Sequence, residues 1–145
     1  MSYANQDSGG YEINRIKNIF CDKKPNMRVI KKSLGHKLYI NLMRNCSVVI
    51  GNSSSGVIES PILGVPSINI GNRQNGRYMA DTVVQVETNK EHIVSAIKET
   101  LNKTNHDISH AFGLGKTSDL IVSHIKRFLD EYNPSNIKKF NDIDY

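Results

Sequence analysis

The sequence predicts an α/β domain in which a parallel sheet is covered by helices on both faces. Over residues 11–129, short apolar stretches alternate with segments whose apolar residues recur every three or four positions, and this alternation is typical of βαβ units. The strand-like stretches are apolar at consecutive positions, as expected for strands buried on both faces. A chain of 145 residues is long enough for one domain with its own core.

The first 26 residues predict a polar loop followed by a helix. Residues 1–10 are polar and contain a Gly-Gly pair. From Tyr11 onward, isoleucines at positions 13, 16 and 19 form one apolar helix face, and the helix should end near Pro25. Because a doubly wound unit normally opens with a strand, we expect the first strand of the domain to be missing before Met1.

Residues 27–63 predict the centre of the domain. Met27–Ile30 is a short β-prone run, and a helical pattern follows through Leu38, Leu42 and Met43. Cys46–Ile50 is a continuous apolar stretch and predicts a strand that stops at Gly51. Ser53–Leu63 predicts the next helix, so a strand, a small polar turn and a helix follow one another directly.

The second half predicts two more strands and two helices. Pro66–Ile70 and Thr82–Val86 are the expected strands. Asn89 is a suitable N-cap for a helix whose apolar residues share one face. Residues 102–115 resemble a loop, and the last helix is expected from Lys116 to Leu129.

We therefore expect one domain over residues 1–132, followed by a polar tail over 133–145. The apolar stripe of the last helix includes His124, which we expect to be a core residue and not a ligand. The histidines lack metal-ligand spacing, so neither a metal nor a cofactor is expected.

The positive charge is concentrated in the first third. Residues 1–50 carry nine Lys/Arg against three Asp/Glu, whereas residues 51–145 carry ten against eleven. Such a segment suits the phosphates of a nucleic acid, one phosphorylated small molecule, or a solvated surface. Aromatic residues amount to 7% without tryptophan, so platforms for stacking bases are scarce. Charge alone leaves the partner undecided.

Composition also predicts the cellular compartment of the protein. No apolar run approaches the roughly 20 residues that cross a bilayer, so no membrane span is expected. The first twenty residues contain no apolar segment of the secretory type. Cys21 and Cys46 have no CxxC spacing, which fits a reducing cytoplasm.

The stretch from Gly51 to Gly56 is the most informative motif. It leads from a buried strand into a helix and contains Ser53, Ser54 and Ser55. At the carboxyl edge of a parallel sheet, small residues, hydroxyls and unpaired helix N–H groups suit an anionic phosphate. The alternative is a serine-rich cap in front of an ordinary helix.

Three charged residues are placed near that turn. Glu59 follows Ser53 by six residues and could accept hydrogen bonds from a ribose diol, or simply stabilise the helix surface. Arg73 and Arg77 follow the next strand and should leave the same sheet edge. Guanidinium groups bind phosphates bidentately, so we expect both arginines beside the serine turn.

Two further motifs are incomplete. Gly113–Thr117 ends like a phosphate-binding P-loop, but His110 stands where that pattern requires glycine and no apolar strand precedes it. Gly51–Ser55 lacks only the final glycine of a GxSxG nucleophile elbow centred on Ser53. Asp107 and His110 are the only triad partners in the right order, so a serine hydrolase is a less favoured alternative.

Several motifs in one register resemble the hydrolysing UDP-N-acetylglucosamine 2-epimerase family. The resemblance covers most of residues 4–129 and rests on five segments. These segments are Asn5–Gly10 (with Gln6 a departure from the family's pattern), Ser33–Gly35 with Tyr39, Gly51–Glu59, Gly64–Gly71 with Arg73–Arg77, and Gly113–Gly115.

The resemblance implies one half of a glycosyltransferase-B architecture, namely the second of two Rossmann-like domains. By this resemblance Ser53 and Ser54 contact phosphate, Ser55 and Gly56 complete the turn, Glu59 holds the ribose, and Arg73 belongs to the nucleotide site. The family converts UDP-N-acetylglucosamine, or a related UDP-diacetamido sugar, and water to the 2-epimeric free sugar and UDP. The family's acid and base residues lie in the other domain and at its junction.

Two classes of function follow from the sequence. The chain is expected to be the UDP-binding half of an epimerase that is inactive alone; the alternative is an autonomous nucleotide, nucleotide-sugar or nucleic-acid binding module. The expected partners are UDP or a UDP-sugar, together with the missing first domain. Because a truncated sheet exposes an unpaired edge, self-association is the other expectation.

Overall fold

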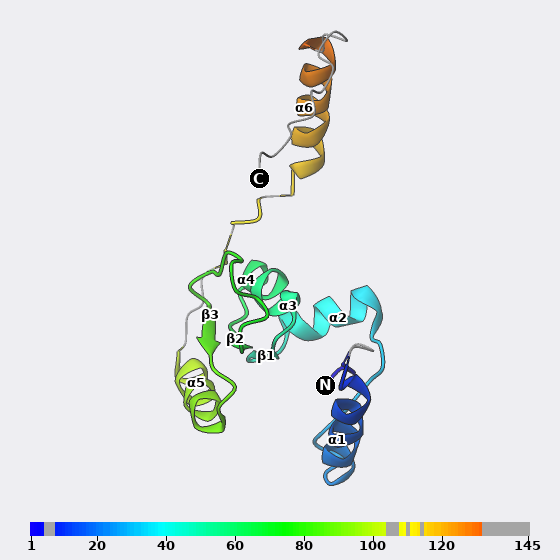
Figure 1. Cartoon of the computed structure of the whole chain (residues 1–145), viewed down its shortest axis with the longest axis vertical. Coiled ribbons are helices and arrows are strands. Elements are labelled where there is room, and N and C mark those ends of the chain that lie inside the picture. Colours follow the sequence, from blue (N-terminus) through cyan, green and yellow to red (C-terminus); the bar gives the residue numbers. More distant parts are fainter. Residues whose placement is uncertain (5–7, 104–107, 110, 114, 132–145) are drawn as a thin grey trace, which may run out of the picture. The chain divides into compact units, whose positions relative to one another are not determined.

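The computed structural model describes residues 1–4, 8–103, 108–109, 111–113 and 115–131 (Figure 1). The chain divides into two compact units, Met1–Ser109 and His110–Tyr145. Each unit is described by itself. The expected tail over 133–145 lies outside the described residues.

Three parallel strands form the sheet of the first unit. They are β1 (Val49–Gly51), β2 (Ser67–Ile70) and β3 (Val83–Val86), hydrogen-bonded in the order β1-β2-β3. Ile68 is the register partner of Ile50 on one side and of Val84 on the other. Since all three strands are parallel, their carboxyl ends share one edge, and the predicted parallel α/β fold is confirmed.

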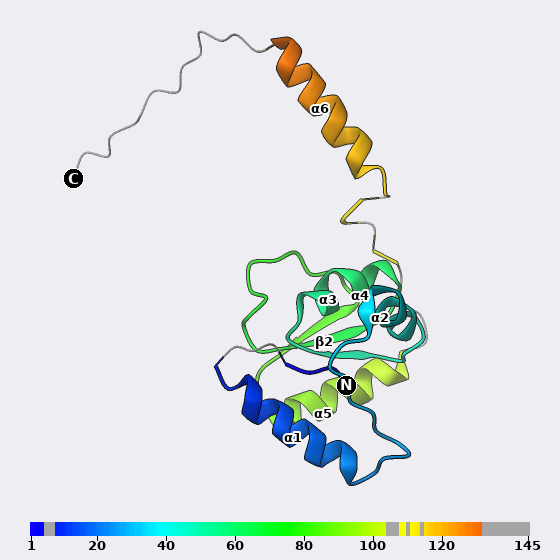
Figure 2. The same cartoon turned by 90° about the vertical axis from the view of Figure 1, so that its right-hand side faces the viewer.

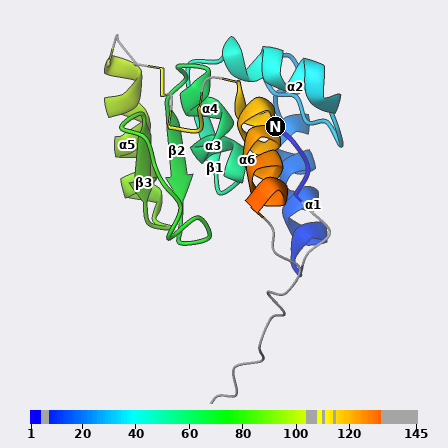
Figure 3. The ribbon, with the colours of Figure 1, turned by 90° about the horizontal axis from the view of Figure 1, so that it is seen from above.

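Helices cover both faces of this sheet. α3 (Ser54–Val57) and α4 (Glu59–Ile62) lie on one side of the strands, and α5 (Lys90–Asn102) lies on the other (Figures 2 and 3). The contacts agree, since α3 packs on β1 and β2, whereas α5 packs on β2 and β3. Asn89 caps α5 as predicted, because its Oδ1 accepts the His92 N–H at 3.0 Å.

The single helix predicted over Ser53–Leu63 is wrong, because the structure divides it at Ile58. Ile58 has φ −110° and ψ −65°, and α4 begins at the next residue. Proline explains the break: in a continuous helix, Pro61 could not donate to the Val57 carbonyl and its ring would collide with that oxygen. In α4 it occupies the first turn instead, where a missing N–H costs nothing.

β1 is shorter than the Cys46–Ile50 strand that the sequence predicts. α2 (Gly35–Arg44) is followed by a turn, in which the Cys46 N–H donates to the Met43 carbonyl at 3.2 Å. The chain becomes extended only after this turn, and the strand then continues through Gly51.

The core of the first unit is small and lies around the middle strand. Ile68 of β2 is 1% exposed. Val57 is completely buried in α3, the helix that packs on β1 and β2. One buried polar group is paired locally, since the Ser60 hydroxyl donates to the Val65 carbonyl at 2.8 Å. Because β2 is buried, the loop that leads into it and the loop that follows it are held in place at the strand.

The first third of the chain is built differently. α1 (Gly10–Asp22) and α2 are the helices that the sequence predicts. The predicted strand over Met27–Ile30 is wrong, because Met27 N–H and Arg28 N–H both donate to the Lys24 carbonyl in a turn. Among the described residues of this segment, β pairing consists of one isolated parallel bridge between Ser2 and Lys31.

The second unit contains α6 (Thr117–Glu131), close to the predicted last helix. Taken by itself, this helix exposes its apolar stripe, with Leu120, Phe128 and Leu129 each at 60% exposure or more. His124 lies on the helix surface, with Nδ1 at 3.4 Å from Arg127 Nη2, and so is not a core residue of this unit. In the described part of the chain, no helix has the length and apolar character needed to cross a membrane.

Candidate binding site

A cavity of about 940 Å³ opens at the carboxyl edge of the sheet, inside the first unit. On one side it is lined by the residues that end β1 and β2, including Gly51, Asn52, Ser53 and Ile70. On the other side it is lined by the first third of the chain, mainly by Ser2–Ala4, Ser8, Gly10, Ile13, Lys17, Lys32–His36 and Tyr39. The site therefore has two walls, one from the sheet and one from the N-terminal segment.

The lining is electropositive. Lys17, Lys32 and Arg73 line the cavity together with His36, and the described lining residues include no carboxylate. Within the described residues the salt bridges are Glu12–Arg15 and Glu87–His92, so none neutralises these three cations. A polar cavity with several uncompensated cations attracts an anionic ligand.

The serine turn forms one rim of the cavity, and Ser53 and Ser55 line it. Ser53 is the N-cap of α3, where its Oγ accepts the Ser55 N–H at 3.4 Å. The Gly56 N–H donates to the Ser53 carbonyl at 3.1 Å. Two of the amides predicted to receive a phosphate are thus already bonded within the turn.

The helix that follows is too short for the predicted dipole effect. α3 has four residues, whereas a substantial macrodipole requires aligned peptides over several turns. The Ser54 N–H has no acceptor among the described residues. The donors that line this rim are therefore the hydroxyls of Ser53 and Ser55, not a long helix N-terminus.

Ser54 and Gly56 do not line the cavity. Gly56 packs against the next strand, where a Cβ at this position would lie 3.8 Å from Ser67 Cβ. The Ser67 hydroxyl also donates to the Gly56 carbonyl. The structure thus gives Gly56 a packing position behind the turn, whereas the sequence predicts contact with phosphate.

Of the two predicted arginines, the structure brings one to the serine turn. Arg73 lines the cavity, and its Nη1 donates to the Asn52 carbonyl at 3.1 Å. Arg77 is exposed, does not line the cavity, and donates its backbone N–H to the Gln74 carbonyl at 3.2 Å. A tight turn at 74–77 separates the two arginines.

Glu59 stands at the start of α4, behind the serine turn, and does not line the cavity. Its Oε2 is buried and has no hydrogen-bond partner among the described residues. Burial of a polar oxygen without a partner is unfavourable, so this carboxylate has unused capacity to accept hydrogen bonds.

Sequence reasoning missed four individual residues of the site: Lys17, Lys32 and His36, which line the cavity, and Gln74, which contacts its wall. In the sequence, Lys17, Lys32 and His36 appeared only as part of the basic first third, and Gln74 only as part of an arginine motif. Gln74 does not line the cavity, but it is 3% exposed, and its Nε2 donates to the Asn52 carbonyl at 2.8 Å. For Lys32 the sequence does contain a signal that could have identified it as a site residue, because Lys32 directly precedes a glycine-containing turn that leads into a helix.

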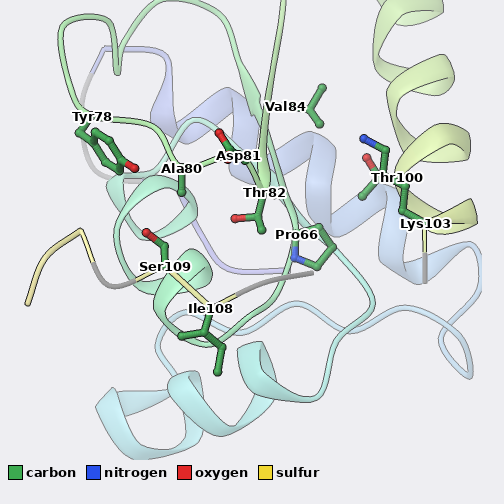
Figure 4. A pocket seen from close by; sticks show the side chains of 10 residues that line it. All are labelled: Pro66, Tyr78, Ala80, Asp81, Thr82, Val84, Thr100, Lys103, Ile108 and Ser109. Carbon is green, nitrogen blue, oxygen red and sulfur yellow. The ribbon is translucent and has the colours of Figure 1, made fainter. Parts of the chain in front are cut away.

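A smaller hollow of about 290 Å³ lies at the opposite edge of the sheet (Figure 4). It is lined by Pro66, just before β2, by Thr82, just before β3, and by Thr100 of α5. The two threonine hydroxyls are buried without a partner among the described residues. This hollow contains none of the residues that the sequence predicts for binding, so we place the candidate site in the larger cavity.

Some predicted features lie outside the described residues. These are Asn5–Asp7 of the opening motif, the triad candidates Asp107 and His110, and Leu114 of the late glycine motif. Within the described residues, no group of three metal-ligating side chains occurs.

Comparison with known proteins decides the family. A family model described as UDP-N-acetylglucosamine 2-epimerase matches residues 1–126, which include both walls of the cavity. The chain belongs to the UDP-N-acetylglucosamine 2-epimerase family. The predicted family resemblance is thereby confirmed.

Individual relatives of this epimerase family agree. The chain is 36% identical over 122 residues to a UDP-N,N′-diacetylbacillosamine 2-epimerase (hydrolyzing) of Legionella pneumophila, covering 84% of this chain. It is 41% identical over 86 residues, or 59% of this chain, to a GDP/UDP-N,N′-diacetylbacillosamine 2-epimerase (hydrolyzing) of Campylobacter jejuni. A UDP-N-acetylglucosamine 2-epimerase of Neisseria meningitidis is 29% identical over 113 residues, 77% of this chain.

The chain spans only part of the length of these epimerases. The matched segments amount to 32%, 22% and 30% of the three relatives, respectively.

Proposed function

We propose that this chain is the UDP-binding half of a hydrolysing UDP-sugar 2-epimerase and that it does not turn over substrate alone. The complete reaction would convert a UDP-2-acetamido sugar and water to the 2-epimeric free sugar and UDP. The chain would contribute the second of two Rossmann-like domains of a glycosyltransferase-B architecture. Its partner would be the remaining two-thirds of the protein.

The observation that carries this proposal is the cavity lined by Lys17, Lys32 and Arg73 without a described carboxylate. The pyrophosphate of UDP is a compact polyanion, and fixed cations stabilise the charge that accumulates on it when it leaves. Arg73 can use the N–H groups that do not contact Asn52 to bind a phosphate oxygen. Ser53 and Ser55 add hydroxyl donors at the same rim.

The same lining supports the absence of turnover. Epimerisation and hydrolysis both move protons, so they need groups that act as general acid and base. Among the described lining residues His36 and Tyr39 could exchange protons, but no carboxylate is present to complete an acid–base pair. We assign these groups to the remaining part of the protein, which would close over the cavity.

The nucleoside would extend from the pyrophosphate toward Glu59. Its buried Oε2 lacks a partner among the described residues, and a ribose diol offers two donors. Because Glu59 does not line the cavity, this contact requires the start of α4 to open toward the ligand. We also propose that Ser54 and Gly56 support the serine turn from behind. Arg77, which is exposed and does not line the cavity, would reach the phosphates only if its loop moved.

The open edge of the sheet supports a missing partner. β1 pairs only with β2 among the described strands, and Ile50 is 44% exposed. Unpaired strand edges are normally covered in native proteins. The rest of the protein, or failing that a second copy of the chain, would cover this edge. Cys21 and Cys46 are free thiols, which fits a protein of the reducing cytoplasm.

Titration of the full chain with UDP, UMP and uridine tests the proposal. We expect UDP to bind most tightly and uridine least, because the cations contact the pyrophosphate. Ser53→Ala and Arg73→Ala should weaken UDP binding, whereas Arg44→Ala, an exposed arginine that does not line the cavity, should not. UDP-N-acetylglucosamine should compete with UDP and remain intact.

Three outcomes would contradict the proposal. Equal affinities for uridine and UDP would show that the pyrophosphate does not contribute to binding. Release of free sugar by the chain alone would show that it contains the catalytic groups. Salt-sensitive binding of an oligonucleotide that is indifferent to Arg73→Ala would favour the nucleic-acid alternative.

A further inference from the structure

A buried glutamine joins the two loops of the sheet-side wall. Gln74 Nε2 donates to the Asn52 carbonyl at 2.8 Å, and Arg73 Nη1 donates to the same oxygen at 3.1 Å. Asn52 precedes the serine turn after β1, whereas Arg73 and Gln74 follow β2. One carbonyl oxygen thus accepts two side-chain donors from the neighbouring loop.

The burial of the glutamine distinguishes it from its neighbours. Gln74 is 3% exposed, although the residues on both sides of it, Arg73 and Asn75, are exposed. Its Oε1 is buried without a donor among the described residues. An amide that served only to fill space would be better replaced by an apolar side chain of similar size. The hydrogen bond from Gln74 Nε2 to the Asn52 carbonyl therefore explains why an amide side chain occupies this buried position.

The loop that carries Gln74 is also fixed at its beginning. The Gly71 N–H donates to the Val86 carbonyl at 2.8 Å, and Gln85 Nε2 donates to the Gly71 carbonyl at 2.5 Å. Gln85 is held in turn by Asn69, whose Nδ2 donates to Gln85 Oε1 at 2.6 Å. With Gly71 anchored to β3, a bond from Gln74 to Asn52 sets the distance between the two loops.

We propose that Gln74 is a positioning residue that holds the Asn52 carbonyl and thereby sets the Ser53 turn and Arg73 in place for a pyrophosphate. This inference rests on the proposed function. Asn52 lines the cavity, and its carbonyl oxygen carries partial negative charge that repels an anion. Two donors offset that charge, and they keep the oxygen directed toward the Arg73 loop.

The hydrogen bond from Gln74 to the Asn52 carbonyl also determines how many N–H donors of Arg73 remain available to a ligand. If Gln74 did not share the Asn52 oxygen, Arg73 alone would have to satisfy it. The guanidinium has five N–H donors in a fixed fork, so its orientation toward the loop decides which donors face the cavity. Gln74 therefore acts through Arg73 and the serine turn, without touching the ligand.

Amide hydrogen exchange and UDP titration of three variants test the inference. Gln74→Met keeps the approximate size and removes the donor. Asn75→Ala is the control, because Asn75 is exposed in the same loop. In Gln74→Met we expect faster exchange at residues 53–56, unchanged exchange in α5, and UDP binding weakened about tenfold; Asn75→Ala should change none of these.

Gln74→Glu adds a pH test that a space-filling role would not affect. The neutral carboxylic acid can donate to the Asn52 oxygen, but the carboxylate cannot, and it would repel both that oxygen and the ligand. Burial raises the pKa of a glutamate above its ordinary value of about 4.3. Between pH 8 and pH 5, the ratio of this variant's UDP affinity to that of the unsubstituted chain should therefore rise, while the ratio for Gln74→Met stays constant.

The outcomes separate this inference from the proposed function. If the unsubstituted chain does not bind UDP, the proposed function fails, and exchange at residues 53–56 still decides whether Gln74 holds the turn. If the chain binds UDP and Gln74→Met leaves either the exchange or the affinity unchanged, the inference is overturned. A constant ratio for Gln74→Glu across this pH range would overturn it as well.

Discussion

The two walls of the cavity are held together in different ways. The sheet-side wall continues three hydrogen-bonded strands, and its loops are joined through the Asn52 carbonyl. The N-terminal wall depends on one isolated bridge between Ser2 and Lys31 and on local contacts, such as the Ala4 N–H donating to Asn14 Oδ1 at 2.7 Å.

Burial shows the same contrast. Ile68, behind the sheet-side wall, is 1% exposed, whereas Ile16 of α1, on the N-terminal side, is 55% exposed. The difference indicates that the sheet-side wall is preformed by packing, whereas the N-terminal wall supplies charge with little packing behind it. A ligand would therefore find a fixed surface on one side and an adaptable one on the other.

The largest expected effect sharpens this contrast in stability. Ile68→Ala should lower the free energy of unfolding by about 2–5 kcal/mol, because it leaves a cavity at the centre of the sheet. Ile16→Ala should cost less than about 1 kcal/mol, since most of that side chain is already in water. Urea unfolding followed by circular dichroism measures both, and equal losses would show that the two walls are packed alike.

The next largest effect concerns the cation held by the preformed wall. Arg73→Ala should weaken UDP binding by about 10- to 100-fold, because a charge-assisted hydrogen bond from a fixed donor is lost. Arg44→Ala serves as the matched control. Calorimetric titration gives both affinities, and comparable UDP affinities of the two variants would show that Arg73 does not contact the ligand.

A smaller effect is expected from the adaptable wall. Lys32→Ala should weaken UDP binding only about two- to fivefold, since a flexible ammonium at this wall contributes mainly screened attraction. The loss should shrink as salt rises, while the loss for Arg73→Ala should persist. Affinities measured at 50 mM and 500 mM salt separate the two, and a salt-independent loss at Lys32 would show that this wall is as rigid as the other.

The smallest effect reports on the connection between the walls. Cys46 lies between α2 and β1; the residue as a whole is exposed, but partial desolvation of its sulfur raises the pKa of the thiol. Since only the thiolate reacts, alkylation by iodoacetamide at pH 8 should be a few-fold slower than for a cysteine in an unfolded peptide. Mass spectrometry of a time course measures the rate; a faster reaction than in the peptide would mean that this connection is open.

The regular elements could be predicted from the sequence because their local signals agree with the packing. The isoleucine spacing of α1 and the Asn89 cap of α5 are short-range patterns. The break at Ile58 could have been anticipated from Pro61, but the apolar periodicity concealed it. The failure of Met27–Ile30 to form a strand has a tertiary cause, because a β-prone run becomes a strand only beside a partner. Among the described residues, pairing near this run is limited to the bridge between Ser2 and Lys31.

The site could be predicted only in part. The serine turn and Arg73 follow adjacent parallel strands, and topology alone places them at one edge. Arg77 could not be separated from Arg73 by sequence, since the turn at 74–77 directs it elsewhere. Gln74 is identified only by its burial and its bond to Asn52, and neither property has a local signature.

Mapping the UDP-induced amide shifts by NMR tests the central claim most directly. If UDP occupies the cavity between the two walls, the largest shifts should fall at Ser53–Ser55, Arg73 and Lys32–His36, and should disappear in Arg73→Ala. Shifts concentrated instead at Thr82 and Thr100, around the hollow at the opposite edge, or no shifts at millimolar UDP, would contradict the account.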